Sequence, residues 1–209
     1  MMQLYSTKPL YGATTAIFQI ELANKECVYM SAIRTPYGND RRCVVIVDAD
    51  KFVQLWRNEP ARVHDSISQG TIETWKNFRK LPSATEGFLC SIDNPVPLAT
   101  VFYSKASSSP EISKPSFLES VKKLIGIPHP HKVTNFNEFI GFTNGITRII
   151  WLLVQGVKYF PVECMIENGP EQLCELAGYQ GLSYKTVEEL TNENVDVALL
   201  WPDLHQANF

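Results

Sequence analysis

Hydrophobic and polar positions alternate in the first part of the chain, as they do in strands. Residues 14–22 (TTAIFQIEL) and 25–33 (KECVYMSAI) mix this alternation with β-branched and aromatic side chains. Residues 44–47 form a continuous apolar run, which indicates a strand covered on both faces. We therefore predict an N-terminal strand meander over about residues 1–48.

Helical spacing follows the meander. Asp48 is placed to cap a helix over 49–58, where one face carries Phe52, Leu55 and Trp56. A second helix is predicted over 70–81, with an apolar side made of Ile72, Trp75 and Phe78. Its other side carries the cations Lys76, Arg79 and Lys80. Such a run could contact acidic protein or nucleic acid, but a solvated helix face is the commoner interpretation.

A strand over 94–103 is entered through two prolines, which suits an edge or a strand start. The Ser/Pro-rich segment 104–115 then has little to bury, and a capping box, Ser116 with Glu119, opens a helix over 116–126. We predict an insertion over about 104–132 that carries this helix and separates two strands of the core.

The stretch 139–164 (FIGFTNGITRIIWLLVQGVKYFPVEC) predicts a short strand, a turn at 143–145, a helix over 146–155 that ends at Gly156, and a further strand. The helix would bury one stripe made of Ile146, Ile149, Ile150 and Leu153. Trp151 lies off that stripe, where it could cover the loop, meet a partner or pack on a neighbouring element. A last helix begins at Gly169-Pro170 and ends at Gly178. Clustered strands mixed with helices predict an α+β fold.

The turn before the 146–155 helix has the chemistry of an anion site. Gly145 allows close backbone approach, the first-turn N–H groups are unpaired, and Arg148 leans towards the helix N-terminus. Its forked guanidinium matches phosphate oxygens, and Asn144 and Thr147 add short polar groups. The alternative is an ordinary helix cap supplied by Asn144 or Thr143. Spacing alone leaves both interpretations open.

Composition narrows the class of protein. The 209 residues fit one domain, and the net charge of −3 argues against a surface that tracks nucleic acid. The start of the chain does not resemble a secretory signal, and the longest apolar run, residues 149–154, is too short to cross a membrane. Five scattered cysteines suggest reduced thiols. We expect a cytoplasmic protein without membrane insertion.

Catalytic and metal-binding groups are harder to assign. The pair His129 and His131 could be half of a metal site, but a solvated loop is the better interpretation. A metal-dependent nuclease needs two or three converging carboxylates. Asp48 is accounted for by capping, Asp93 by a turn, and Glu163 as a strand end free to face solvent. The sequence therefore names no catalytic carboxylate and no metal ligand.

The order of four segments resembles the ParB/sulfiredoxin fold, and more closely the plasmid fertility-inhibition factors of the FipA/Osa type. The segments are VVIVDADKFVQLWR (44–57), NPVPLATV (94–101), GFTNGITR (141–148) and LLVQGVKYFPVE (152–163). The resemblance spans about residues 42–163 with gaps and excludes 104–132 and the tail. It implies a single ParB/sulfiredoxin-like α+β domain over 1–209, a mixed sheet with flanking helices and a helical insertion.

The resemblance also implies a function. Such factors block transfer of a competing conjugative plasmid, and the FipA type is thought to act on the type IV secretion coupling protein, a TraG-type ATPase. Osa-like relatives have been credited with nucleotide hydrolysis and DNA cleavage, which would use an ATP-like nucleotide with Mg²⁺ as cofactor. Carried onto this chain, the phosphate-binding positions are Asn144, Gly145, Thr147 and Arg148.

Departures from the resemblance limit what can be carried over. A sulfiredoxin needs a cysteine in the loop, where this chain has Ile146 and Thr147. No DNA-binding helix-turn-helix is visible, so DNA is a less favoured partner. Three hypotheses stay open: a non-catalytic inhibitor that binds the coupling protein, a nucleotide hydrolase or nuclease, and a nucleotide switch without its own DNA-binding part.

Overall fold

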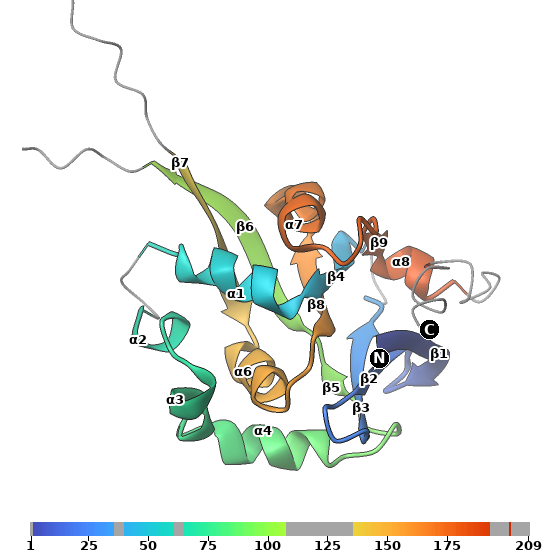
Figure 1. Ribbon diagram of the computed structural model, residues 1–209. Coiled ribbons are helices and arrows are strands. Elements are labelled where there is room, and N and C mark those ends of the chain that lie inside the picture. Colours follow the sequence, from blue (N-terminus) through green and yellow to red (C-terminus); the bar gives the residue numbers. More distant parts are fainter. Residues whose placement is uncertain (1, 36–39, 61–64, 108–135, 193–200, 202–209) are drawn as a thin grey trace, which may run out of the picture.

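The computed structural model describes residues 2–35, 40–60, 65–107, 136–192 and 201. Among these residues the strands form two mixed sheets, one with strand order β1-β2-β3-β5 and one with β7-β6-β8-β4-β9 (Figure 1). The first sheet contains β1 (Met2–Leu10), β2 (Ala13–Glu21), β3 (Cys27–Ile33) and β5 (Val96–Pro97). The second contains β4 (Arg42–Asp48), β6 (Ala99–Ser107), β7 (Phe136–Asn144), β8 (Tyr159–Met165) and β9 (Lys185–Thr186).

The first sheet is an antiparallel meander extended by a short parallel strand. β1 pairs with β2 and β2 with β3, and β5 joins β3 in parallel at Met30 and Ser31. β4 does not continue this meander: it lies in the second sheet, antiparallel to β8 on one side and to β9 on the other. Val44 to Val47 are buried at that central position, which confirms that this strand is covered on both faces.

The chain changes sheets at Leu98. The predicted strand over 94–103 is in fact two strands, β5 in the first sheet and β6 in the second. Pro97 has no N–H to continue a ladder, and the N–H of Leu98 donates to the carbonyl of Ser31 at 2.9 Å. The NPVPLAT segment therefore joins the two sheets.

Short helices surround the second sheet. They are α1 (Ala49–Arg57), α2 (Asp65–Ser68), α3 (Ile72–Lys76), α4 (Leu81–Phe88), α6 (Ile146–Val154), the 3₁₀ turn η1 (Ile166–Asn168), α7 (Pro170–Ala177) and α8 (Val187–Leu190). Helix α6 lies between β6 of this sheet and the pair α3 and α4 (Figure 1). Within the described ranges, no helix has the length and apolar character needed to cross a membrane.

The helix predicted over 70–81 is wrong in extent. α3 ends at the C-cap Asn77, and a separate helix α4, which the sequence did not predict, begins at Leu81. Pro82 explains the break, because its ring would clash with the carbonyl of residue 78 in a continuous helix, whereas a proline is well tolerated in a first turn. The cations Lys76, Arg79 and Lys80 are exposed, as predicted.

Several local predictions are confirmed. The Asp48 carboxylate accepts hydrogen bonds from the N–H groups of Asp50 and Lys51 and caps α1. Gly156 has a positive φ of 72° just beyond the end of α6, and α7 begins at Pro170 and ends before Gly178. These signals involve only neighbours in sequence, so the sequence carries them directly.

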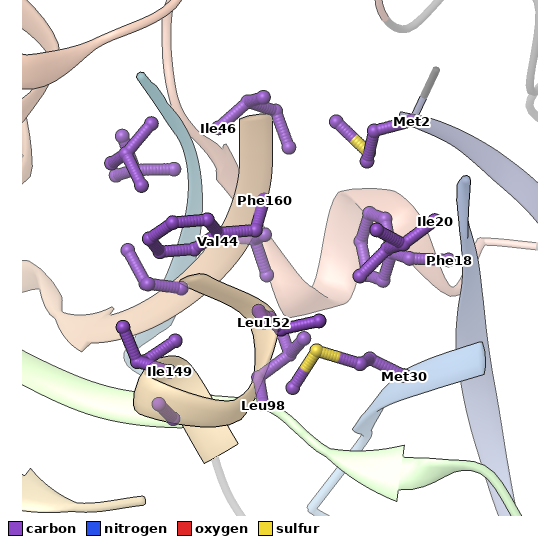
Figure 2. Packing of buried hydrophobic residues seen from close by; sticks show 14 of the residues in the cluster. Met2, Phe18, Ile20, Met30, Val44, Ile46, Leu98, Ile149, Leu152 and Phe160 are labelled. Atoms are coloured by element: carbon purple, nitrogen blue, oxygen red, sulfur yellow. The ribbon is translucent and has the colours of Figure 1, made fainter. Parts of the chain in front are cut away.

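One hydrophobic core joins both sheets and α6. Figure 2 shows Leu98, Ile149 and Leu152 among side chains of the first sheet, such as Phe18 and Met30, and of the second. The second-sheet residues labelled there are Val44, Ile46 and Phe160. Helix α6 buries more than the predicted stripe, since Trp151 and Leu152 are buried as well. The fold is thus α+β with flanking helices, as predicted.

The connection between β6 and β7 contains the predicted insertion. β6 continues to Ser107, so residues 104–107 belong to the sheet and not to the insertion. β6 and β7 pair in antiparallel register from Thr100 to Ser107, which places two core strands on either side of the connection. The capping box at Ser116, the helix predicted over 116–126 and the histidines 129 and 131 lie outside the described residues. The division into one domain with an insertion stays a prediction.

Candidate functional site: the loop before α6

The loop before α6 is shorter than its sequence suggests. β7 runs to Asn144, so Thr143 and Asn144 belong to the strand and not to a turn. The N-cap is Gly145 itself, in a left-handed conformation with φ 87° and ψ 12°, and no side chain caps the helix. The predicted cap by Asn144 or Thr143 is therefore wrong: a strand passes into a helix through one glycine.

Gly145 is needed for close approach, but to the protein's own backbone. A Cβ added at Gly145 would lie 2.7 Å from the Cα and 2.8 Å from the Cβ of Ala99. Real Cβ atoms do not come this close to other carbons, so any other residue requires the first residue of β6 to move. The space beside this glycine is occupied by the start of β6.

Arg148 is hydrogen-bonded to the point where the chain changes sheets. Its Nη1 donates to the carbonyl oxygen of Pro97 at 2.9 Å and to that of Leu98 at 2.7 Å. The guanidinium is half-buried, and this burial lowers the pKa of Arg148 against the opposite effect of the nearby Glu163 carboxylate. One arginine thus connects the NPVPLAT and FTNGITR segments.

The four predicted phosphate-binding residues do not converge on one point. Thr147 and Arg148 line a pocket between α4 and the first turn of α6. Asn144 is exposed at the end of β7, where it pairs with Thr100, and Gly145 packs on Ala99. Neither is among the residues that line the pocket. The phosphate-binding role of the four stays a prediction, and Lys80, the N-cap of α4, is a pocket residue that the loop sequence did not indicate.

Glu163 does not face solvent, contrary to the prediction. It lies within β8 and is 7% exposed. Nη1 of Arg42 donates to Oε1 of Glu163 at 3.1 Å, and the same guanidinium binds both carboxylate oxygens of Asp40. Burial raises the pKa of Glu163, and Arg42 and Arg148 act in the opposite direction. Burial works against the charge of Asp40 too, but the hydrogen bonds from Arg42 and from the Thr35 N–H outweigh it and lower that pKa to about 2.

This buried charge network was not visible in the sequence. Arg42 and Glu163 are 121 positions apart, and only the antiparallel pairing of β4 with β8 brings them together. The signal available beforehand was a charged residue within an otherwise apolar strand sequence, YFPVECM. A charge within such a strand is a buried group that needs a partner.

The four tryptophans are all buried, so packing is their role. Trp151 stacks on Phe88 with ring centroids 4.1 Å apart, and its indole N–H donates to the hydroxyl of Thr85 at 2.9 Å. Trp56 stacks on Trp75, and Trp201 packs near Phe18. Trp151 therefore fixes α4 against α6 and does not cover the loop as an exposed partner contact.

The cysteines and the metal-binding residue types bear on whether the described residues contain a reactive site. All five cysteines are free thiols, and burial raises the pKa of Cys43 to about 11 and raises that of Cys164 as well. Thiols in that state are poor nucleophiles at neutral pH. In the part of the chain that the structure describes, His, Cys, Asp and Glu form no group of three suited to a metal ion.

The sequence matches the model of one known protein family over most of its length. A family model described as "Plasmid Fertility inhibition factor" matches residues 44–178, more than half of the chain. The match begins in β4 and ends after α7, so β1 to β3 lie outside it. No curated protein matches the chain.

A solved structure is similar over most of the chain. It is the crystal structure of Oncogenic Suppression Activity Protein, a plasmid fertility inhibition factor, as a gold(I) cyanide derivative. The TM-score is 0.62 at 21% sequence identity, with 91% of this chain and 83% of that chain covered. At this identity the likeness shows a shared fold.

Proposed function

The chain belongs to the plasmid fertility inhibition factor family, and from this premise we propose that it acts by binding. Its proposed partner is the coupling protein of a competing plasmid, the TraG-type ATPase that delivers DNA to a type IV secretion channel. Occupying that ATPase would stop conjugative transfer without any covalent chemistry by the inhibitor. The proposal needs a rigid, well-ordered surface and no catalytic group.

One observation supports binding over catalysis. Arg148, the residue best suited to a phosphate, donates from Nη1 to the carbonyls of Pro97 and Leu98. Gly145, the residue best suited to close ligand approach, packs on Ala99. Both residues thus stabilise the junction of the two sheets. The loop before α6 therefore helps to hold the two sheets together. A rigid scaffold of this kind suits a protein that inhibits by presenting a binding surface.

The test combines a mating assay with a direct binding assay. Donor cells carry the competing plasmid and express the protein, and the purified protein is tested against the purified cytosolic domain of the coupling ATPase. We expect reduced transfer together with saturable binding. If transfer is blocked but the purified domains do not bind, the coupling protein is not the target and the proposed mechanism fails.

A second candidate is a nucleotide hydrolase or nuclease that uses an ATP-like nucleotide with Mg²⁺. It is favoured by the pocket at the start of α6, where Thr147 and Arg148 lie with Lys80, because cations beside a helix N-terminus attract phosphate. Thr147→Val removes a hydroxyl and keeps the side-chain shape. If the protein is a hydrolase or nuclease, the wild type should hydrolyse ATP or cleave plasmid DNA. Thr147→Val should then weaken both this activity and the inhibition of mating. Full mating inhibition by a protein without either activity excludes this candidate.

A further inference from the structure

A pocket of about 420 Å³ lies between α4 and the first turn of α6, with a residue of β5 as a third wall. Its lining residues are Lys80, Ser83, Ala84, Gly87, Phe88, Val96, Thr147 and Arg148. Four of these eight lie in α4 and a fifth, Lys80, is its N-cap; their spacings of three and four residues show that the pocket runs along one face of the helix. The stack of Phe88 on Trp151 holds that helix in place.

The pocket combines an apolar base with a cationic rim. Phe88 is buried, and Ala84 and Val96 are partly buried against the core. The two charged residues that line the pocket, Lys80 and Arg148, are both cations. The whole chain has a net charge of −3, so this local sign is opposite to the average of the protein. An acidic partner would be attracted to this rim.

We infer that this pocket docks a polypeptide segment of the partner in which an apolar side chain is flanked by Asp or Glu. The apolar side chain fills the space above Phe88, Ala84 and Val96, and the carboxylates face Lys80 and Arg148. A buried apolar anchor within a polar rim is the usual arrangement of a strong contact point between proteins. The inference rests on the proposed function and specifies the surface that performs it.

A nucleotide fits the same pocket less well. Phosphate needs several converging donors, whereas the pocket offers Lys80 and only those N–H groups of Arg148 that its two Nη1 bonds to carbonyls leave over. That supply suits the single charge of a carboxylate better than a triphosphate. The backbone at Gly145 packs on Ala99 and does not line the pocket. The remaining lining is mostly apolar, which suits a side chain better than a triphosphate.

Gly87 offers a substitution with a matched control. It lies in α4, and a Cβ added there would meet only Val96 Cγ2 at 3.9 Å, which is ordinary contact. Gly87→Leu therefore fills the pocket, whereas Gly87→Ala leaves most of it open. Both replacements favour a helix over glycine, so neither is expected to unfold the protein. Thermal unfolding of both variants verifies this point.

Lys80 offers a second, electrostatic comparison. Lys80→Glu reverses a charge on the rim, and an acidic residue at the start of α4 is compatible with the helix dipole. Lys76→Glu makes the same change at an exposed cation of α3 that does not line the pocket. The net charge of the two variants is identical, so long-range effects cancel between them.

The variants are measured in the mating assay, for affinity to the cytosolic domain of the coupling ATPase, and for binding of ATP with Mg²⁺. We expect Gly87→Leu and Lys80→Glu each to weaken partner binding by about 10-fold or more and to restore transfer. Gly87→Ala, which fills much less of the pocket, should weaken binding less than Gly87→Leu, and Lys76→Glu should stay within about 2-fold of wild type. Equal inhibition and affinity in all four variants would overturn the docking site.

The two proposals fail in different ways. If wild type binds the coupling ATPase and the pocket variants bind equally well, the target is correct and the docking surface lies elsewhere. If wild type does not bind that domain, yet only the pocket variants lose mating inhibition, the docking pocket stands and the partner was misidentified. If the pocket variants lose ATP binding and keep partner binding, the pocket belongs to a nucleotide and the inference is overturned.

Discussion

Nη1 of Arg42 donates a 3.1 Å hydrogen bond to Oε1 of Glu163, although one residue begins β4 and the other lies within β8. Nη2 of the same guanidinium also binds the carbonyl of Ile33 and, at 2.9 Å, the hydroxyl of Thr35. One arginine thereby connects the end of β3 in the first sheet with two strands of the second. Strands β1 to β3, which lie outside the family match, are attached to the matched part of the chain partly through this residue.

Arg42→Met should destabilise the protein strongly. It would leave Asp40 and Glu163 as carboxylates whose side chains are only 2% and 9% exposed, without their shared cation. Removing one partner of a buried ion pair costs about 3–5 kcal/mol. Arg41→Met is the matched control, because it breaks an ion pair on the surface. Nη2 of Arg41 lies 3.4 Å from Oε2 of Glu167, and the two side chains are 60% and 48% exposed. Urea unfolding should show a change of less than about 1 kcal/mol for that control. Equal effects of the two substitutions would contradict a structural role for the buried network.

Asp40 should make the stability of the protein depend on acid pH. Its pKa is lowered to about 2 in the folded state from an ordinary value of 3.8. A carboxylate with a lowered pKa stabilises the fold above its unfolded pKa, and this contribution is lost as the pH falls from about 4 to about 2. Its size is roughly 2 kcal/mol. Glu163 has the opposite sign: its raised pKa favours the fold at low pH, and that contribution is lost as the pH rises through the folded pKa.

The measurement compares wild type with Asp40→Asn by urea unfolding at several pH values. The difference in free energy of unfolding should be largest near neutral pH and should shrink as the pH falls from 4 to 2. A difference that is constant over this range would show that the Asp40 carboxylate does not keep its lowered pKa in the folded protein.

The contrast between Asp48 and Glu163 shows which parts of this structure the sequence can predict. The Asp48 cap, Gly156 after α6, and the boundaries of α7 depend on residues within one helical turn, and all were predicted correctly. The role of Glu163 depends on strand pairing across 121 positions, and the exchange of sheets at Leu98 depends on which strand β5 finds as a neighbour. Local pattern carries no information on either.

The candidate loop illustrates the same limit. The sequence singled out Gly145 and Arg148 for phosphate binding, because glycine permits a left-handed conformation and arginine supplies a fork of donors, and that role stays a prediction. It did not indicate that both would contact the β5–β6 junction, about 50 residues earlier, as the separation of Arg148 from Leu98 shows. The sequence placed Lys80 on the solvated face of one continuous helix. The break before α4 instead places Lys80 beside the pocket, and the sequence pattern did not indicate this.

Gly145→Ala should destabilise the protein more than a positive φ alone requires. Two costs add: φ of +87° is unfavourable for alanine, and the new Cβ would lie 2.7 Å from the Cα of Ala99. Gly181→Ala is the control, with φ of +72° and nothing within 4 Å of the added Cβ. We expect a loss of about 1 kcal/mol for the control and about 2–4 kcal/mol for Gly145→Ala in chemical denaturation. Equal losses would mean that β6 adjusts freely and that the close approach to Ala99 contributes nothing.

Trp151 should determine both stability and the shape of the docking pocket. Its ring stacks on Phe88, which forms the base of the pocket, and its N–H binds Thr85 on the same helix. Trp151→Ala removes a large buried side chain and should cost about 3–5 kcal/mol. Trp151→Phe keeps an aromatic ring against Phe88 but loses the hydrogen bond, which should lower the free energy of unfolding by about 1–2 kcal/mol.

Thr85→Val separates the hydrogen bond from the stack, because it removes only the acceptor of the indole N–H. If the stack positions α4, Thr85→Val and Trp151→Phe should keep most of the partner affinity at a temperature where each is folded. Trp151→Ala should lose that affinity under the same folded conditions, since Phe88 would then be free to move into the cavity left by the indole. Unchanged affinity of folded Trp151→Ala would show that the pocket does not depend on the position of Phe88, and would remove the apolar anchor from the docking argument.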